Sequence, residues 1–309
     1  MKVEYLRDVK RIITHANCPD GMASAILLDY VFPHIEIEFY IHSDNSYLNM
    51  KAEPGMLFCD IAPPAQRAEE FIENKSIVLD HHKGAKDLVL SFGDRGVFAD
   101  ETEEPGVSGA YLAWREVFSA IVSESLPVYE NAKEFARIAG VRDTWQVSNP
   151  DFIKSCHQAS MLTFYSWDYW HSLEYVDFVF SNEMNVGRKL FEKRKLDVKK
   201  CIENSLIYNL NGYKVAIFND PNKLCSDVAE SLRKDGVSII AGFSYFKKDN
   251  NMNLGYSLRS DESFNVQEFA STLGGGGHSR ASGFSVPTNE RDNPFLKFNS
   301  LLKDFLSLQ

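Results

Sequence analysis

An aspartate and two histidines, Asp80-His81-His82, come directly after the apolar run at residues 76–79. A short apolar run bounded by polar residues is typical of a buried strand. Three ionisable groups at the end of such a strand are costly to desolvate unless partners compensate them. The triplet therefore predicts a buried strand with a polar site at its end.

Short apolar runs and helical patterns alternate through the first half of the chain. Asp20-Gly21 predicts a turn between the first strand and the first helix. This alternation is typical of α/β domains, in which a mainly parallel sheet carries flanking helices on both faces. The predicted strands are at residues 11–14, 35–41, 56–59 and 76–79, and the predicted helices are at residues 22–31 and 65–74.

Acidic residues recur at the ends of the predicted strands. Asp20 follows the first strand, Asp60 the third and Asp80 the fourth. Since ligand groups in an open α/β sheet cluster beyond the carboxyl ends of the strands, we expect these carboxylates to converge. A single aspartate in such a place is more often a turn or helix-cap residue, so the prediction depends on the whole set.

A mixed set of oxygen and nitrogen donors is therefore available for divalent cations. Mg²⁺ and Mn²⁺ prefer carboxylate oxygens, and imidazole nitrogen shifts the preference toward Mn²⁺, Fe²⁺, Co²⁺ or Zn²⁺. One ion with five ligands is one interpretation, and two ions that share a bridging aspartate, as is typical of phosphoester hydrolysis, is the interpretation that we favour. The candidate ligands are His15, Asp20, Asp60, His81 and Asp143.

A charged, proline-free helical pattern between residues 183 and 206 predicts a connecting helix. Its lysines and arginines indicate a solvated helix face, with a substrate-guiding role as the alternative. A second, smaller α/β pattern follows and ends in Gly274-Gly275-Gly276-Gly277-His278. Its predicted strands are at residues 214–218, 237–246 and 254–258, and its predicted helices are at residues 226–234 and 266–273.

The 309 residues, of which 44% are apolar, predict two domains, because single cores stop growing near about 250 to 300 residues. The formal net charge of -10 disfavours a broad basic face for long nucleic acids, but it allows a short phosphate-bearing ligand at one cationic spot. No membrane span or signal peptide is expected. Five cysteines without a CxxC pair favour a reducing, cytoplasmic location.

Five short motifs follow one another along the chain, at residues 14–21 (THANCPDG), 58–60 (FCD), 79–83 (LDHHK), 140–145 (GVRDTW) and 274–284 (GGGGHSRASGF). With these motifs the chain resembles the DHH phosphoesterase superfamily, and most closely its nano-RNase or oligoribonuclease branch. The resemblance implies a metal-binding catalytic domain at residues 1–183, a linker helix at 184–211 and a DHH-associated substrate-binding domain at 212–309.

The resemblance also implies a role for each ligand. One metal is held by His15 and Asp60, and the other by Asp20, Asp60, His81 and Asp143, so that Asp60 bridges the two. In the same motif, His82 faces the scissile phosphate and Asp80 orients an imidazole from behind. The C-terminal domain holds the remainder of the substrate through Arg259, His278 and the backbone amides of Gly276 and Gly277.

Cys18 departs from the superfamily pattern, which usually has an aspartate two residues before the position matched by Asp20. Three interpretations stay open. Cys18 is a thiolate ligand that favours metals softer than Mg²⁺, an unliganded small residue that leaves the first metal weakly bound, or a sign that catalysis has been lost.

Together these features predict a two-metal phosphoesterase that hydrolyses a phosphoester bond in a short oligoribonucleotide, a linear dinucleotide or 3′-phosphoadenosine phosphate. Two divalent ions are expected, with Mn²⁺ first and Mg²⁺, Co²⁺ or Zn²⁺ as alternatives. An exopolyphosphatase or pyrophosphatase-like hydrolase is the alternative enzyme, and a catalytically degenerate nucleotide-binding protein is the non-enzymatic alternative. Neither long nucleic acid nor a membrane is expected as a partner, and a homodimer is left open.

Overall fold

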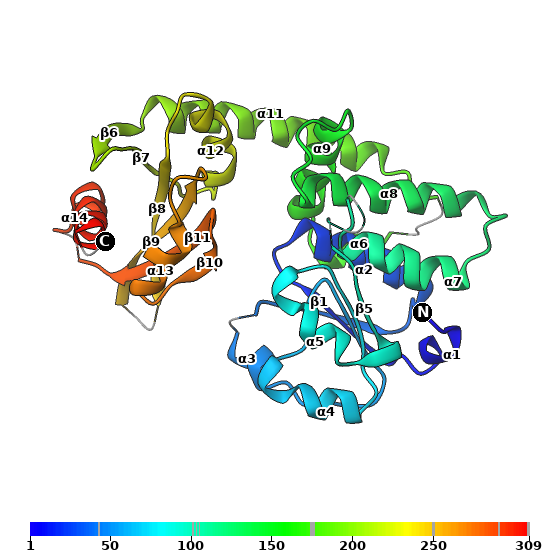
Figure 1. The fold of residues 1–309 in the computed structure, drawn as a ribbon. Helices are drawn as coiled ribbons and strands as arrows, with labels where there is room; N and C mark the ends of the chain where they lie inside the picture. The colour runs from blue at the N-terminus through cyan, green and yellow to red at the C-terminus, as the bar shows by residue number, and fades with distance from the viewer. Residues whose placement is uncertain are drawn as a thin grey trace. The chain divides into compact units, whose positions relative to one another are not determined.

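The computed structural model describes residues 1–42, 44–100, 102, 104, 106–173, 177–248, 251–289 and 291–307. The chain forms two compact units, Met1–Glu192 and Lys193–Gln309. Helix α11 (Ser181–Glu203) begins in the first unit and ends in the second (Figure 1). No helix in the described part of the chain is long and apolar enough to cross a membrane.

The first unit is built on a five-stranded sheet in which every neighbouring pair is parallel, in the order β2-β1-β3-β4-β5. This confirms the predicted parallel sheet with flanking helices. The edge strand β5 is only three residues long, and the sequence pattern does not predict it. The strands are β1 (Arg11–His15), β2 (Glu36–Tyr40), β3 (Met56–Cys59), β4 (Ile77–Asp80) and β5 (Gly96–Phe98).

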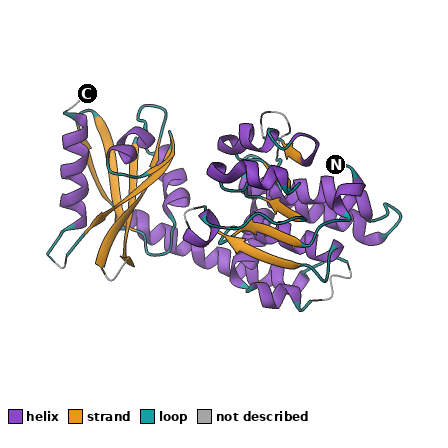
Figure 2. Ribbon diagram, turned by 90° about the horizontal axis from the view of Figure 1, so that it is seen from below, coloured by secondary structure: helices purple, strands orange, loops and turns teal. Residues whose placement is uncertain are grey.

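Alternate residues of the strands point into two separate hydrophobic cores, one on each face of the sheet. Ile12 and Leu57 belong to the first core, whereas the next residues, Ile13 and Phe58, belong to the second. Figure 2 shows the helices on both sides of the strands. The first core is covered by α2 (Pro19–Val31), α6 (Gly109–Leu112) and α8 (Pro127–Asp143), and the second by α3 (Asn45–Leu48), α4 (Ala68–Glu73) and α5 (Lys86–Leu90).

The remaining helices and turns complete the first unit. The α-helices are α1 (Val3–Leu6), α7 (Ser119–Ile121), α9 (Phe152–Phe164) and α10 (Trp167–His171). Three 3₁₀ turns, η1 (Ala65–Arg67), η2 (Lys83–Ala85) and η3 (Gly93–Arg95), and one π-helical segment, η4 (Ala113–Phe118), join the longer elements.

The turn expected at Asp20-Gly21 is wrong, because both residues lie in the first turn of α2, which begins at Pro19. Proline and glycine indicate turns in a sequence, but proline is also favoured at the first position of a helix, where its missing N–H costs nothing. A Cβ on Gly21 would lie 2.2 Å from the carbonyl oxygen of His15, so glycine lets the helix start directly against the end of β1. Asp20 is therefore a helical residue.

The second unit contains a six-stranded mixed sheet in the order β10-β11-β9-β8-β7-β6, in which only β7 and β8 are parallel among the described strands. This confirms the smaller α/β domain. Residues 206–210, which were expected in the linker, form the edge strand β6. The strands are β6 (Leu206–Leu210), β7 (Tyr213–Asn219), β8 (Ile239–Lys248), β9 (Asn251–Ser260), β10 (Gly276–His278) and β11 (Ala281–Pro287).

Helices cover both faces of this sheet as well. Val215 and Ile217 face one hydrophobic core, and Ala216 and Phe218 face another. The first core includes residues of α13 (Val266–Thr272) and α14 (Pro294–Leu306), and the second is covered by α12 (Cys225–Lys234) and by the end of α11.

Asp220 gives a test of how the second unit is held together. Its buried carboxylate accepts hydrogen bonds from the backbone N–H of Leu224 (2.5 Å) and Cys225 (2.9 Å), where α12 begins. The substitution Asp220→Ala leaves both donors without this partner, and we expect the free energy of unfolding to fall by about 1 to 2 kcal/mol in urea denaturation. The control is Asp94→Ala, which removes an exposed ion pair with Lys2 and should change nothing measurable. Equal effects of the two substitutions would contradict the prediction.

Candidate metal centre

Polar side chains gather at the carboxyl ends of three neighbouring strands of the first sheet. His15 is the last residue of β1, Asp60 directly follows β3, and Asp80 ends β4. Strand β2 lies on one side of β1 and β3 on the other, so the order in which the strands are added to the sheet reverses between β1 and β3. Open α/β sheets bind ligands at such switch points.

Two helices bring further carboxylates to the same place. Asp20 lies in the first turn of α2, and Asp143 is the last residue of α8. The Nε2 atom of His81 is 3.8 Å from Asp20 Oδ2 and 3.4 Å from Asp143 Oδ2. It is also 3.1 Å from Asp60 Oδ1. One imidazole and three carboxylates therefore converge on one small volume.

The other oxygen of Asp60 faces a second group. Asp60 Oδ2 is 3.8 Å from Nδ1 of His15. The donor atoms of His15, Cys18 and Asp60 all lie within 4.8 Å of one another, as do those of Asp20, His81 and Asp143. Asp60 thus has one oxygen directed at each group, which is the geometry that a bridging carboxylate needs.

Charge crowding at the cluster requires compensation. Burial and the neighbouring Asp20 raise the pKa of Asp60 well above its usual value. The same two causes, in the same order, raise the pKa of Asp143 to about 6. His15 Nδ1 and Asp60 Oδ2 are buried and have no hydrogen-bond partner among the described residues. Unpartnered donors of this kind beside several carboxylates fit a divalent cation, which would neutralise the charge and complete their coordination.

Asp80 serves a different purpose. It is fully buried, and its Oδ1 accepts hydrogen bonds from the backbone N–H of His82 (2.9 Å) and from His82 Nδ1 (2.7 Å). Burial alone would lower the pKa of His82, but the bond to Asp80 outweighs it and the pKa rises to about 9. The ring is therefore held in one orientation as an imidazolium, with its Nε2–H directed away from Asp80.

The start of helix α6 contacts the cluster through hydrogen bonds to Asp20. The backbone N–H groups of Gly109 and Ala110 donate to the two oxygens of Asp20, at 2.5 Å and 3.1 Å. A Cβ on Gly109 would lie 2.3 Å from Cβ of Asp60 and 2.9 Å from Oδ2 of Asp20. Only glycine therefore fits between the two carboxylates.

Sequence reasoning missed two residues of this site. Gly109 gives no local signal, because its role depends on the approach of α6 to Asp60. The ring of His42 lies 5.3 Å from that of His15 and 6.3 Å from that of His82, measured between ring centroids. His42 follows the end of β2, so the strand-end rule that identified the aspartates could also have found it.

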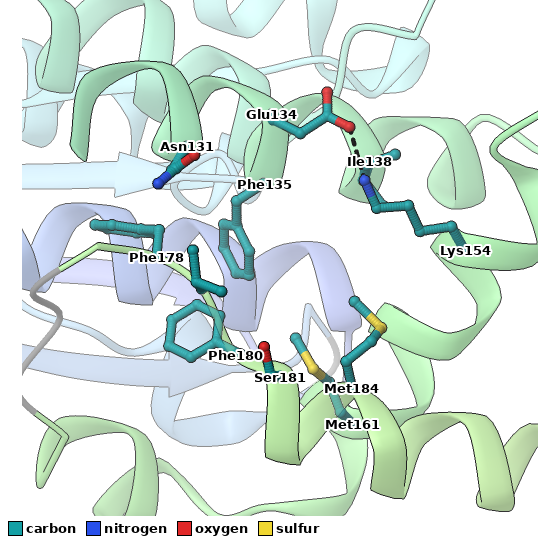
Figure 3. Close-up of a pocket in the computed structure, with 11 residues that line it drawn as sticks. Asn131, Glu134, Phe135, Ile138, Lys154, Met161, Phe178, Phe180, Ser181 and Met184 are labelled. Carbon is teal, nitrogen blue, oxygen red and sulfur yellow. Dashed lines mark hydrogen bonds and ion pairs between the residues drawn. The ribbon is translucent and has the colours of Figure 1, made fainter. Parts of the chain in front are cut away.

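Two cavities lie near the helices that carry this site. A cavity of about 140 Å³ is lined in part by Asp20, Arg142 and Asp143, so it opens directly beside the cluster. A larger, apolar cavity of about 270 Å³ lies between α8, α9 and the start of α11 and contains none of the predicted ligands. Figure 3 shows its aromatic side chains, in which Phe135 is 5.4 Å from Phe180 between ring centroids.

Comparison with known proteins identifies a C-terminal domain and a shared fold. Residues 211–307 match the DHHA1 domain family. A pGpG-specific phosphodiesterase from Vibrio cholerae, PggH, has the same fold, with a TM-score of 0.55 and 14% identity over 95% of this chain and 98% of that one. The chain therefore resembles the DHH superfamily in its DHHA1 domain and in its fold. The assignment of Asp80-His81-His82 as the DHH triplet stays a prediction, as does the nano-RNase branch.

Other known proteins are similar to this chain in fold or in sequence. An exopolyphosphatase-related protein from Bacteroides fragilis has a TM-score of 0.53 and 13% identity, over 99% of this chain and 95% of that one. RecJ from Thermus thermophilus, in complex with Mn²⁺, has a TM-score of 0.54 and 14% identity, over 99% of this chain but 53% of RecJ. The uncharacterized protein R106 of Acanthamoeba polyphaga mimivirus is 25% identical over 315 residues, which cover 93% of this chain and 69% of R106.

The predicted substrate residues lie together in the DHHA1 domain. Ala281 of β11 pairs with His278 of β10 on one side and with Arg259 of β9 on the other. The Arg259 guanidinium donates to Ser226 Oγ at 2.8 and 3.2 Å and to the Leu258 carbonyl at 2.7 Å. Gly276, Gly277 and His278 are exposed, so this edge of the sheet is open to a ligand.

The position of Gly109 predicts a specific loss of metal binding. Gly109→Ala forces its new Cβ against Asp60, and we expect the affinity for Mn²⁺ to fall by about tenfold or more. The control is Gly84→Ala, because nothing lies within 4 Å of the Cβ position of Gly84. Titration calorimetry on metal-stripped protein would measure both. An unchanged affinity in Gly109→Ala would show that the cluster is not the metal site.

Asp60 allows a second test, by thermal denaturation. The wild-type melting temperature should rise when Mn²⁺ is added to stripped protein, because an ion that binds only the folded state stabilises it. Asp60→Asn should lose most of this rise. Asparagine is the right substitution because Asp60 has a φ of 64°, which asparagine tolerates. The stripped variant should be at least as stable as stripped wild type, since one crowded buried charge is gone; a large destabilisation would contradict this account.

Proposed function

We propose that the chain is a metal-dependent phosphoesterase that hydrolyses a phosphoester bond in a small nucleotide: a short oligoribonucleotide, a linear dinucleotide or 3′-phosphoadenosine phosphate. One observation carries the proposal. Asp60 is 1% exposed and directs one oxygen at His81 and the other at His15, so that a single carboxylate serves two groups of metal donors. Two adjacent divalent ions are the arrangement typical of phosphoester hydrolysis.

In this proposal His15 and Asp60 hold one ion, and Asp20, Asp60, His81 and Asp143 hold the other. Mn²⁺ is the first choice for such mixed oxygen and nitrogen donors. The structures of RecJ in complex with Mn²⁺ and with Mg²⁺ support a divalent ion without favouring either. The chemistry that bound ions supply here is activation of water near neutral pH and neutralisation of phosphate charge. The amides of Gly109 and Ala110 hold Asp20 in place for this purpose.

His82 acts on the substrate itself. Since its pKa is raised to about 9, the ring carries a proton on Nε2 at neutral pH. It donates this hydrogen to a non-bridging phosphate oxygen, or transfers the proton to the leaving oxygen, and Asp80 keeps the ring pointed toward the substrate. Asp80 is therefore a positioning residue and His82 the catalytic one.

The DHHA1 domain binds the rest of the substrate. Arg259 and His278, on strands that flank β11, offer a guanidinium for phosphate and a ring for a base or a phosphate. The pKa of Arg233 is lowered, chiefly by burial. The positive charges of Arg259 and Arg280 lower it further, so the three arginines lie close together. A local concentration of arginines in a chain of net charge -10 favours a short anionic ligand over a long nucleic acid.

The comparisons support a small substrate without identifying it. The name of PggH gives pGpG, a dinucleotide, as its substrate. The exopolyphosphatase-related relative supports the alternative, a polyphosphate or pyrophosphate hydrolase, which would need the same ions but no base recognition. The non-enzymatic alternative, a nucleotide-binding protein without turnover, depends on Cys18 having weakened the first metal position.

A substrate panel tests the proposal. Stripped protein supplied with Mn²⁺ should hydrolyse pGpG, a short oligoribonucleotide or 3′-phosphoadenosine phosphate faster than pyrophosphate or polyphosphate. Asp60→Asn should lower kcat/KM by about 100-fold or more, since it weakens both metal positions at once. Asp94→Asn, on the exposed surface, is the matched control. Faster hydrolysis of polyphosphate would favour the alternative enzyme, and nucleotide binding without any product would favour the degenerate binder.

A further inference from the structure

Three groups of possible metal donors lie at this cluster, one of them Asp60, His81 and His82, and the other two differ in chemistry. The group of Asp20, His81 and Asp143 offers oxygen and nitrogen. The other, of His15, Cys18 and Asp60, offers nitrogen, sulfur and oxygen, with all three donor atoms within 4.8 Å of one another. One sulfur, one imidazole nitrogen and one carboxylate oxygen resemble the three-ligand sets that bind zinc with an open fourth position.

The helix does not explain the cysteine. Cys18 is the N-cap residue of α2, with extended backbone (φ -118°, ψ 128°), and its side chain makes no capping hydrogen bond. Aspartate, serine and asparagine are preferred at this position because their oxygen accepts a backbone N–H, and cysteine supplies no comparable acceptor. The thiol interacts with the backbone of Gly21 and is thus at most a weak cap for α2, and its sulfur lies with the donor atoms of His15 and Asp60.

Independent atoms point into the same space. Asp60 Oδ2 and His15 Nδ1 are both buried and lack a hydrogen-bond partner among the described residues, and they lie 3.8 Å apart. Asp60 itself is 1% exposed. A buried carboxylate oxygen without a donor is costly unless a cation binds it. Cys18 is thus the third donor of a group whose other two already require an ion.

We propose that Cys18 is a metal ligand and makes the first position of this centre selective for a borderline or soft ion such as Zn²⁺ or Co²⁺, while the second position keeps a preference for Mn²⁺ or Mg²⁺. When the metal–sulfur bond forms, the thiol proton leaves to solvent, and no electron is transferred. The inference shares its metal centre with the proposed function, but it makes no use of turnover.

The difference in ligand type decides the selectivity. Thiolate binds Zn²⁺ and Co²⁺ strongly and Mg²⁺ or Mn²⁺ weakly, whereas carboxylates bind the hard ions well. Cys18→Asp should therefore shift the relative affinity of the first position away from Zn²⁺ and toward Mn²⁺ by about tenfold or more. Cys18→Ser keeps the size of the side chain and removes the sulfur.

Cobalt titration gives a direct readout. Stripped wild-type protein titrated with Co²⁺ should develop a sulfur-to-cobalt charge-transfer band in the near ultraviolet. The band should be absent in Cys18→Ser and in Cys18→Asp. It should persist in Cys201→Ser, which removes a free thiol of the second unit. Competition between Zn²⁺ and Mn²⁺, with bound metal measured by elemental analysis, should give the shift in selectivity in the same variants.

The outcomes separate this inference from the proposed function. Cobalt binding without a charge-transfer band in wild type, or a band that survives in Cys18→Ser, would overturn the role of Cys18 and leave the phosphoesterase proposal standing. Failure of Co²⁺, Zn²⁺ and Mn²⁺ all to bind stripped wild type would overturn both. Circular dichroism of each variant establishes that it is folded, so the loss of the band in a folded Cys18→Ser supports the inference.

Discussion

The buried carboxylate of Asp60 is the group on which the metal centre depends. It lies at the end of β3 with almost no exposure, and each of its oxygens faces a different set of donors. Without a cation, burial and the nearby charge of Asp20 both disfavour the ionised form of this carboxylate, which is why its pKa is raised. A divalent ion removes both costs. The apo cluster is therefore unfavourable as it stands, and the fold around it must supply enough stability to hold the carboxylates together.

The fold holds the carboxylates together by bringing the ends of strands and helices close to one another. Parallel strands deliver His15, Asp60 and Asp80 to one edge of the sheet because their carboxyl ends coincide. Helices supply what strands cannot: the first turn of α2 brings Asp20, and the end of α8 brings Asp143. The approach is close enough that Gly109 has no room for a Cβ. The stability of the two hydrophobic cores on either face of the sheet keeps these elements in place.

The way in which strands and helices meet at the site explains what the sequence could and could not predict. The strand pattern identified Asp60 and the DHH triplet, because apolar runs mark strands and the residues after them lie at the sheet edge. It placed Asp20 in a turn, since Pro19 and Gly21 are turn signals as well as helix-start signals. The strand β5 has only three residues, too few for a periodic pattern. Gly109 could not be found, because its role depends on contact with Asp60 across 49 positions of sequence, which no local pattern records.

The two units carry candidate sites of opposite charge. The first collects carboxylates and imidazoles around a place for cations, and the DHHA1 domain collects guanidinium groups and open backbone beside β11. This division favours a substrate with one phosphoester for the metal centre and a further anionic or aromatic part for the second unit. Pyrophosphate offers a phosphoanhydride and no aromatic part, and the net charge of -10 disfavours a long nucleic acid. Under the proposed function a short nucleotide would offer a phosphoester to the candidate metal centre and an anionic or aromatic part to the second unit, so the charge distribution supports the proposed substrate class.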